Sequence, residues 1–179
     1  MTTAYLALGS NLGDRLGAMR AAVRALAGHA ELPIDLAHDV ASLYESGPVG
    51  GPSNQPPYLN SVLRVQTSLA ASDYFAAVLS IETSLGRVRE ERWGPRVIDI
   101  DLLFMGDLII DSPALTLPHP RLHERRFVLE PLSELAADLI HPITGLSIGA
   151  LIQRLRDDRG TETVTRIQGP EWVLESPTG

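Results

Sequence analysis

Residues 3–28 read TAYLALGSNLGDRLGAMRAAVRALAG, and this stretch decides how the chain begins to fold. The first six residues, TAYLAL, predict a short buried strand, and GSNLGD is typical of a turn in which Asp14 caps a helix. Apolar residues then recur at helical spacing from Leu16 to Leu26, and Gly28 can end that helix. The stretch therefore predicts a strand followed by an amphipathic helix.

Further strands are predicted where apolar residues alternate or run together, at residues 34–44, 58–69 and 97–104. Gly106 and Asp107 fit a tight hairpin turn into residues 108–110. Helices are expected from about Ser72 to Gly86, over residues 124–137 with an interruption at Pro131, and over residues 147–156 with Ser147 as a cap.

This order of elements, β-α-β-β-α-β followed by helices, predicts an α+β fold: a ferredoxin-like sandwich with additional C-terminal helices. At 179 residues and 44% hydrophobic composition, the chain is long enough for one compact domain, which we place at residues 1–157. Residues 158–179 are polar and predict a loosely attached tail, in which residues 172–174 could dock as an extra strand.

Composition excludes several classes of protein. No apolar run reaches the length of a membrane span, so we expect a cytoplasmic protein without a membrane partner. The absence of cysteine excludes disulfide frameworks and thiol chemistry, and a net charge of -7 argues against nucleic-acid binding. All 15 basic residues are arginine, which excludes a Walker A lysine and Schiff-base chemistry. If the protein binds phosphate, arginine must do so.

Two aspartates lie on the predicted strand at residues 97–104. Asp99 and Asp101 are separated by one apolar residue, so their carboxylates share one face of the strand. Two neighbouring carboxylates repel each other unless a cation lies between them, and hard oxygen ligands suit Mg²⁺. The alternative is a strand with a solvated polar face, but the apolar neighbours Val97 and Leu103 share that face and make an unpaired charge costly.

Arginines cluster on both sides of this strand. The loop RVREERWGPR, residues 87–96, contains four arginines and Trp93, and could clamp a polyphosphate beside the carboxylates. Its alternative is a solvated loop whose own glutamates pair with the arginines. The segment LPHPRLHERRF, residues 117–127, adds His119, His123 and further arginines. Zinc binding by the two histidines is disfavoured because no third nitrogen ligand lies nearby, so phosphate contacts fit better.

The connection between the second and third strands is unusually long. Residues 45–57 contain seven glycines and prolines in thirteen positions, which is typical of a lid over a ligand. Directly after it, Tyr58 and Asn60 share the strand face opposite the core. They could stack on a heterocycle and hydrogen-bond to it, or could simply be exposed.

Together these segments resemble the 6-hydroxymethyl-7,8-dihydropterin pyrophosphokinase family, from the N-terminus to about residue 155. The resemblance rests on ALGSNLGDR, on YESGPVG with QPPYLNSV, on LGRVREERWGPRVIDIDLLF and on LPHPRLHERRFVLEPL. It implies a folate-pathway enzyme that transfers the pyrophosphoryl group of ATP to 6-hydroxymethyl-7,8-dihydropterin and releases AMP. It also implies two Mg²⁺ ions, and we expect a monomer.

The resemblance also implies roles for individual residues. Asp99 and Asp101 match the Mg²⁺ ligands, and Arg87 and Arg96 match catalytic arginines. Position 102, assigned isoleucine in this matching, is given no ATP contact. ATP contacts are implied for Glu82, Arg89, Trp93, Arg96, His119 and Arg125, and pterin contacts for Ser46, Gly47, Val49, Tyr58, Asn60, Trp93 and Phe127.

The chain departs from the family pattern at two places, and two other functions are alternatives. Ser46-Gly47 stands where members often have Thr-Pro, and Leu79 stands where some have a polar nucleotide contact. A metal-dependent phosphohydrolase would need a water-activating base beside the aspartates. A pterin- or nucleotide-binding module without turnover would need no such cluster of aspartates and arginines.

Overall fold

The computed structural model describes residues 1–48, 55–86, 96–157 and 163–174. These residues form a five-stranded antiparallel sheet in the order β4-β1-β3-β2-β7 and a separate two-stranded sheet, β5-β6. The first six helices and strands follow the predicted order. The elements are β1 (Thr2–Ser10), α1 (Arg15–Ala27), β2 (Leu43–Ser46), β3 (Tyr58–Thr67), α2 (Ala71–Ser84), β4 (Asp99–Met105), β5 (Ile110–Asp111), β6 (Thr116–Leu117), η1 (Leu122–Glu124), α3 (Arg126–Ala136), α4 (Ile148–Asp157), β7 (Val164–Gln168) and η2 (Pro170–Val173).

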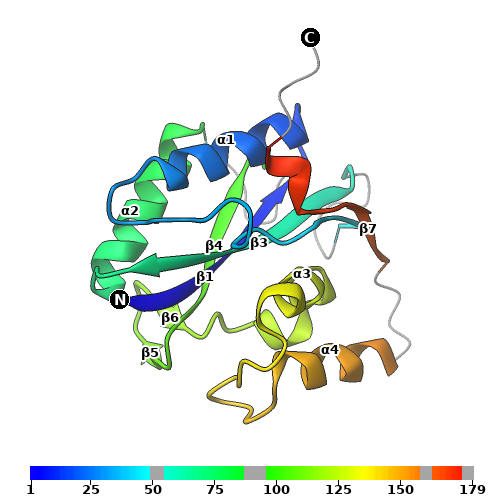
Figure 1. The fold of residues 1–179 in the computed structure, drawn as a ribbon. Coiled ribbons are helices and arrows are strands. Elements are labelled where there is room, and N and C mark those ends of the chain that lie inside the picture. Colours follow the sequence, from blue (N-terminus) through cyan, green and yellow to red (C-terminus); the bar gives the residue numbers. More distant parts are fainter. Residues whose placement is uncertain (49–54, 87–95, 158–162, 175–179) are drawn as a thin grey trace.

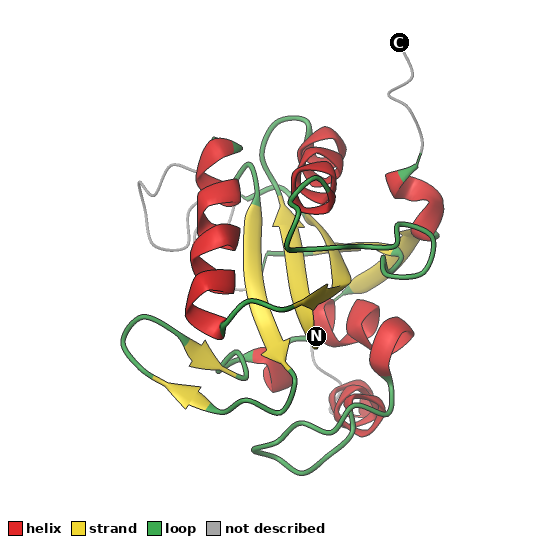
Figure 2. Ribbon diagram, turned by 60° about the vertical axis from the view of Figure 1, so that its left-hand side comes forward, coloured by secondary structure: helices red, strands yellow, loops and turns green. Residues whose placement is uncertain are grey.

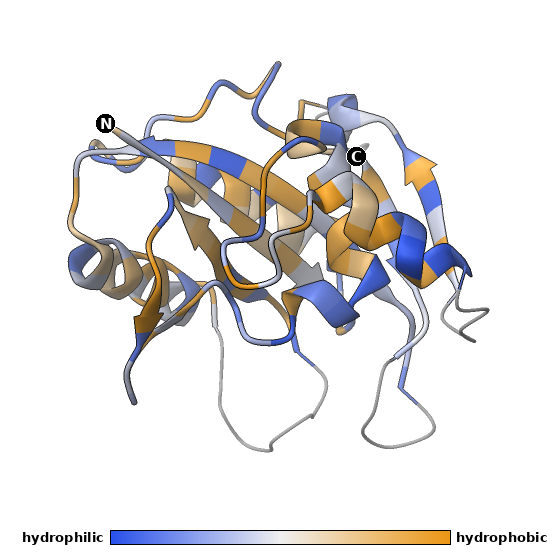
Figure 3. Ribbon diagram, turned by 90° about the horizontal axis from the view of Figure 1, so that it is seen from below, coloured by the Kyte–Doolittle hydropathy of each residue, from blue (hydrophilic) through white to orange (hydrophobic). Residues whose placement is uncertain are grey.

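Helices cover both faces of the large sheet. α1 and α2 lie on one face, and α3 and α4 lie on the other (Figures 1 and 2). Successive residues of β1 point to opposite faces, so Ala4, Leu6 and Leu8 pack with α1 and α2 whereas Tyr5 packs with α3 and α4. Figure 3 shows hydrophobic residues concentrated along the strands between these layers. The fold therefore has two hydrophobic cores that share one sheet.

The predicted helix caps are confirmed. Asp14 Oδ1 accepts a hydrogen bond from the Gly17 N–H at 2.9 Å, and Gly28 directly follows the last residue of α1. Ser147 Oγ accepts from the Ala150 N–H at 3.1 Å at the start of α4. These short polar side chains satisfy backbone donors that have no partner within the helix.

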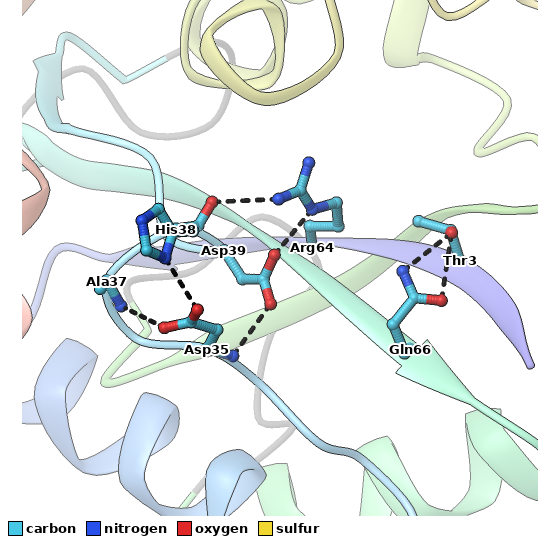
Figure 4. A network of polar contacts seen from close by, with 7 residues as sticks. All are labelled: Thr3, Asp35, Ala37, His38, Asp39, Arg64 and Gln66. Atoms are coloured by element: carbon cyan, nitrogen blue, oxygen red, sulfur yellow. Dashed lines mark hydrogen bonds and ion pairs between the residues drawn. The ribbon is translucent and has the colours of Figure 1, made fainter.

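The strand predicted over residues 34–44 is wrong for most of its length, because β2 begins only at Leu43. Figure 4 shows the reason. Asp35 Oδ1 accepts from the Ala37 N–H at 3.0 Å, and Asp39 Oδ2 accepts from the Asp35 N–H at 2.9 Å. Arg64 of β3 donates to Asp39 Oδ1 at 2.7 Å. The acidic side chains satisfy the backbone of residues 35–37 and so compete with a strand ladder there, whereas residues 39–41 pair with β3 through a single bridge at Val40.

The predicted hairpin after β4 is also wrong. The chain does turn at Gly106, where φ is +54°, but β5 pairs with β6 and not with β4. Ser112 and Leu115 close the connection from β5 to β6, with the Ser112 N–H donating to the Leu115 carbonyl oxygen at 3.1 Å. Pairing across so short a connection has a low entropic cost of loop closure.

The helix predicted over residues 124–137 is present, but Pro131 does not interrupt it. α3 runs through Pro131, and the short helix η1 precedes it. Val128, Leu129 and Leu132 of α3 are buried in the second core. Their packing outweighs the single backbone hydrogen bond that a proline removes.

The prediction of a loosely attached tail is wrong for the described residues after 162. β7 pairs with β2 at the edge of the sheet, and Trp172 in η2 is fully buried. The Trp172 Nε1–H donates to the Ala41 carbonyl oxygen at 2.9 Å, and Arg20 Nε donates to the Trp172 carbonyl oxygen at 2.7 Å. Docking at residues 172–174 was predicted, but as a strand; the added strand lies at residues 164–168 instead. One large indole supplies enough apolar surface to hold the otherwise polar segment in the core.

Candidate active site

A cavity of about 340 Å³ opens on the α3 side of the sheet, where β1 ends and β3 and β4 begin. It draws side chains from four strands, from α3 and from the loop that contains residue 119. The lining residues are Ala7, Leu8, Gly9, Ser46, Gly47, Gln55, Tyr58, Asn60, Ser61, Arg96, Asp99, Asp101, His119, Arg125, Phe127 and Val128.

The pairing of the strands brings two groups of predicted residues together. Gly9 of β1 is opposite Asn60 of β3 on one side and Asp99 of β4 on the other. Directly opposite residues share a face, so Asn60, Gly9 and Asp99 form one row across three strands. A Cβ atom on Gly9 would lie 3.7 Å from Asn60 Oδ1. The absent side chain therefore leaves the cavity floor open between the amide and the carboxylate.

The two aspartates face the cavity together, as predicted. The side chain of Asp99 is 20% exposed and that of Asp101 is 37% exposed, so neither lies on a fully solvated face. Burial and, next, the negative charge of Asp99 together raise the pKa of Asp101 to about 7, against a smaller opposite effect of Arg125. Without a cation, a negative charge on Asp101 beside that of Asp99 therefore costs free energy.

Three basic side chains surround the aspartates. Arg96 Nη1 lies 2.6 Å from Asp99 Oδ2, while Arg125 Nη1 and His119 Nε2 lie 3.9 and 3.8 Å from Asp101 Oδ2. Burial, followed by the charge of Arg125, lowers the pKa of His119 to about 4. His119 is therefore neutral at pH 7. Its Nδ1 accepts from the Arg121 N–H at 3.3 Å, so the proton resides on Nε2, toward Asp101.

These residues fit a magnesium ion better than a transition metal. Within the described ranges, no group of three or more histidine, aspartate or glutamate side chains could hold a metal. Asp99 and Asp101 supply hard oxygen ligands, and Mg²⁺ is commonly held by one or two carboxylates together with water and phosphate oxygens. Unlike His119, His123 does not line the cavity; it packs edge-to-face against His141, with ring centroids 5.6 Å apart.

The other half of the cavity suits a flat heterocycle with polar edges. Tyr58 and Phe127 provide aromatic surfaces, and the Arg125 guanidinium carbon lies 5.6 Å from the centre of the Phe127 ring. Asn60 Nδ2 donates to Ser46 Oγ at 3.0 Å and to the Tyr58 carbonyl oxygen at 3.4 Å. With its amide nitrogen engaged in this way, Asn60 presents Oδ1 as an acceptor for a ligand N–H.

Not every predicted site residue can be placed in the cavity. Arg87, Arg89, Trp93 and Val49 fall outside the described residues. Gly47 lines the cavity, and a Cβ atom there would meet nothing within 4 Å, so a larger residue would fit at this departure from the family pattern. The other departure, at Leu79, is partly buried in α2 and does not line the cavity.

Position 102 needs a correction, because the isoleucine assigned to it is wrong. The residue there is Leu102, directly after Asp101 on β4, so its side chain points to the opposite face of the strand. Leu102 is 4% exposed, lies opposite Leu6 of β1 and packs in the core beside α1 and α2. It does not line the cavity. Its role is to anchor the strand that carries the aspartates.

Several residues of the site were missed from the sequence. Gln55 lines the cavity, and its Oε1 accepts from Asn11 Nδ2 at 3.1 Å. Asn11 Oδ1 also accepts from the Arg96 N–H at 2.8 Å, so one buried amide contacts both segments that border the cavity. On one face of β1 the side chains become smaller from Tyr5 to Ala7 to Gly9. This decrease in size was the sequence pattern that could have predicted the cavity floor.

Glu82 was predicted to contact the nucleotide, but it does not line the cavity. It is 1% exposed on α2, and its Oε1 accepts from the Ile100 N–H of β4 at 2.8 Å. This hydrogen bond connects α2 to the strand that carries both aspartates. The structure therefore gives Glu82 a supporting position behind β4.

Glu82→Ala should lower the free energy of unfolding by about 1–3 kcal/mol, because it removes the acceptor of a buried backbone N–H. Glu82→Gln keeps an oxygen acceptor and should lose much less. Urea unfolding of the two variants measures the difference. Equal losses would show that the hydrogen bond to Ile100 is not what stabilises this position.

The family model for 7,8-dihydro-6-hydroxymethylpterin-pyrophosphokinase (HPPK) matches residues 5–137. Among similar proteins, a 2-amino-4-hydroxy-6-hydroxymethyldihydropteridine pyrophosphokinase of Haemophilus influenzae is 38% identical over 89% of this chain and 96% of its own length. A protein of the same name from Bacillus subtilis is 44% identical over 74% of this chain and 77% of its own length. The folic acid synthesis protein fol1 of Pneumocystis carinii is 41% identical over 86% of this chain, which spans only 20% of that protein.

Solved structures share the fold at low sequence identity. Wild-type Plasmodium falciparum HPPK-DHPS matches with a TM-score of 0.67 and 14% identity, over 88% of this chain and 46% of that one. The chain thus spans less than half of that structure, and the likeness concerns the fold alone. None of the helices in the described ranges combines the length and apolar character needed to cross a bilayer.

Proposed function

The chain belongs to the 7,8-dihydro-6-hydroxymethylpterin-pyrophosphokinase family, and we propose that it transfers the pyrophosphoryl group of ATP to 6-hydroxymethyl-7,8-dihydropterin, in folate biosynthesis. The observation that best supports this proposal is the row Asn60–Gly9–Asp99. It puts a pocket for a heterocycle directly beside a carboxylate pair surrounded by arginine and histidine. A reaction that joins a pterin to a polyphosphate needs these two subsites side by side.

The pterin would lie in the aromatic half of the cavity. Tyr58 and Phe127 flank its ring system, and Asn60 Oδ1 accepts from an N–H on its edge. This arrangement points the hydroxymethyl group along the row toward Asp99. The hydroxymethyl oxygen then attacks the β-phosphorus of ATP, the bond from that phosphorus to the α-phosphate bridging oxygen breaks, and AMP and a proton are released.

The other half of the cavity would bind the ATP phosphates. Asp99 and Asp101 would hold Mg²⁺, with two ions expected, and the bound metal would neutralise charge that develops on the phosphate oxygens. Arg96 and Arg125 supply fixed positive charge, and the neutral His119 donates its Nε2–H. The predicted roles of Arg87, Arg89 and Trp93 rest on the family resemblance alone.

Broader features of the proposal follow from the same observations. The strand order β4-β1-β3-β2 with two helices packed on one face supports a ferredoxin-like sandwich, extended here by β7 and the C-terminal helices. We also expect a cytoplasmic monomer whose partners are its two small-molecule substrates, with neither nucleic acid nor membrane.

The test is to incubate the protein with ATP, Mg²⁺ and 6-hydroxymethyl-7,8-dihydropterin and to follow AMP by chromatography. AMP should form only when all three are present, and EDTA should stop its formation. Release of free phosphate without the pterin would identify a hydrolase. Pterin binding with no AMP under any condition would identify a binding module, and either result would overturn the proposal.

A further inference from the structure

Arg15, the first residue of α1, contacts both ends of the connection between β2 and β3. Its Nη1 donates to Glu45 Oε2 at 2.9 Å and to the Pro57 carbonyl oxygen at 2.7 Å. Glu45 directly precedes Ser46, and Pro57 directly precedes Tyr58. One guanidinium nitrogen therefore contacts the chain directly before Ser46 and directly before Tyr58, and both of these residues line the cavity.

Ser46 and Tyr58 are opposite each other and form the last pair of the β2–β3 ladder. Asn60 depends on both, because its Nδ2 donates to Ser46 Oγ and to the Tyr58 carbonyl oxygen. A shift of this last pair would therefore move the amide that faces the ligand as well as the Tyr58 ring. Arg15 acts at the point where one contact influences three cavity residues.

Arg15 itself lies behind the sheet. Tyr44 and Ser46 point to the α3 side of β2, where the Tyr44 hydroxyl donates to Glu134 Oε1 at 2.6 Å. Glu45 lies between them and so points to the opposite side, toward α1. Arg15 does not line the cavity, and any effect on a ligand must pass through the ladder.

We propose that Arg15 is a positioning residue for the pterin, which it influences by fixing the Ser46–Tyr58 pair from the far side of the sheet. This inference rests on the proposed function. The Arg15–Glu45 pair is partly exposed, with side chains 30% and 37% accessible, and such pairs contribute little to stability. The consequence of its loss should therefore appear mainly in pterin binding.

Steady-state kinetics of AMP formation test the inference with Arg15→Ala. The KM for the pterin should rise about tenfold, as for one lost charge-assisted contact, while the KM for ATP and kcat change less than about twofold. Arg15→Lys keeps a charged donor and should recover part of the affinity. The matched control is Arg24→Ala, an exposed arginine in the last turn of the same helix, which should match wild type.

A double variant shows whether the Arg15–Glu45 contact itself, and not the loss of a positive charge, affects pterin binding. Adding Glu45→Ala to Arg15→Ala should raise the pterin KM less than the product of the two single effects, because both changes remove the same contact. An unchanged pterin KM in Arg15→Ala would overturn the inference, as would equal rises of both KM values. Inactive wild-type protein would instead contradict the proposed function.

Discussion

Replacing Asp101 with asparagine is expected to reduce AMP formation by about 10²–10³-fold while making the metal-free protein more stable at pH 8. Asparagine keeps the size and one oxygen of the side chain but removes the charge. Under the proposed function, the charge is needed to bind Mg²⁺ and so to bind the ATP phosphates productively. In the metal-free chain, however, burial disfavours the same charge and Asp99 repels it.

The pH dependence has a definite sign. Asp101 has a pKa of about 7 in the folded chain, above the ordinary value near 4 of an unfolded aspartate. Protonated Asp101 therefore favours the folded chain; this stabilisation is fully present below about pH 4 and is lost as the pH rises from about 4 to 7. Asp101→Asn removes this loss. Because the side chain is 37% exposed, the gain at pH 8 should be only on the order of 1 kcal/mol.

Thermal unfolding in EDTA at pH 5 and pH 8, together with the AMP assay, measures both effects. The matched control is Asp111→Asn, an exposed aspartate of β5 outside the cavity, which should alter neither activity nor stability. An Asp101→Asn variant that keeps wild-type activity would rule out the metal-binding role. One that loses activity and is also less stable at pH 8 would show that the carboxylate supports the fold.

Trp172→Ala should lower the free energy of unfolding by about 3–5 kcal/mol, a large part of the stability of an ordinary domain. The indole is fully buried in the core beside α1, and its N–H satisfies the Ala41 carbonyl oxygen. Truncation leaves a cavity in that core and an unpaired carbonyl group. The loss should appear in urea unfolding as a lower midpoint.

Leu174→Ala is the control, because Leu174 is two residues away and 61% exposed. Its effect should stay within about 0.5 kcal/mol. Trp172→Phe keeps most of the apolar surface and should fall between the two. A loss below about 1 kcal/mol in Trp172→Ala would mean that residues 164–173 do not help to hold the fold together.

Local sequence patterns predicted several of the residues that line the cavity. Asp99 and Asp101 were placed on one strand face by the period of two alone, and the cavity contains both. Tyr58 and Asn60 were found in the same way. The pattern could not show that Gly9 joins these two groups, because neighbouring strands are chosen by long-range packing that no local window contains.

The errors have a common physical origin. Residues 34–44 alternate like a strand, but Asp35 and Asp39 satisfy the backbone of residues 35–37 locally, and pairing with β3 begins only at residues 39–41. The tail is polar on average, but Trp172 is fully buried and β7 pairs with β2. In both cases the contacts of individual side chains outweighed the average polarity or periodicity of the segment.

The row Asn60–Gly9–Asp99 also means that the sheet fixes the distance between its two outer residues. Neighbouring strands stand about 4.8 Å apart, so the two outer residues of the row are separated by roughly 10 Å whatever their side chains do. Substitutions in the cavity can weaken the hold on either substrate, but they cannot change this spacing. Under the proposed function, the spacing between the residue that faces the pterin and the residue that faces the phosphates is thus a property of the backbone. It should tolerate sequence change for as long as the three strands keep their register.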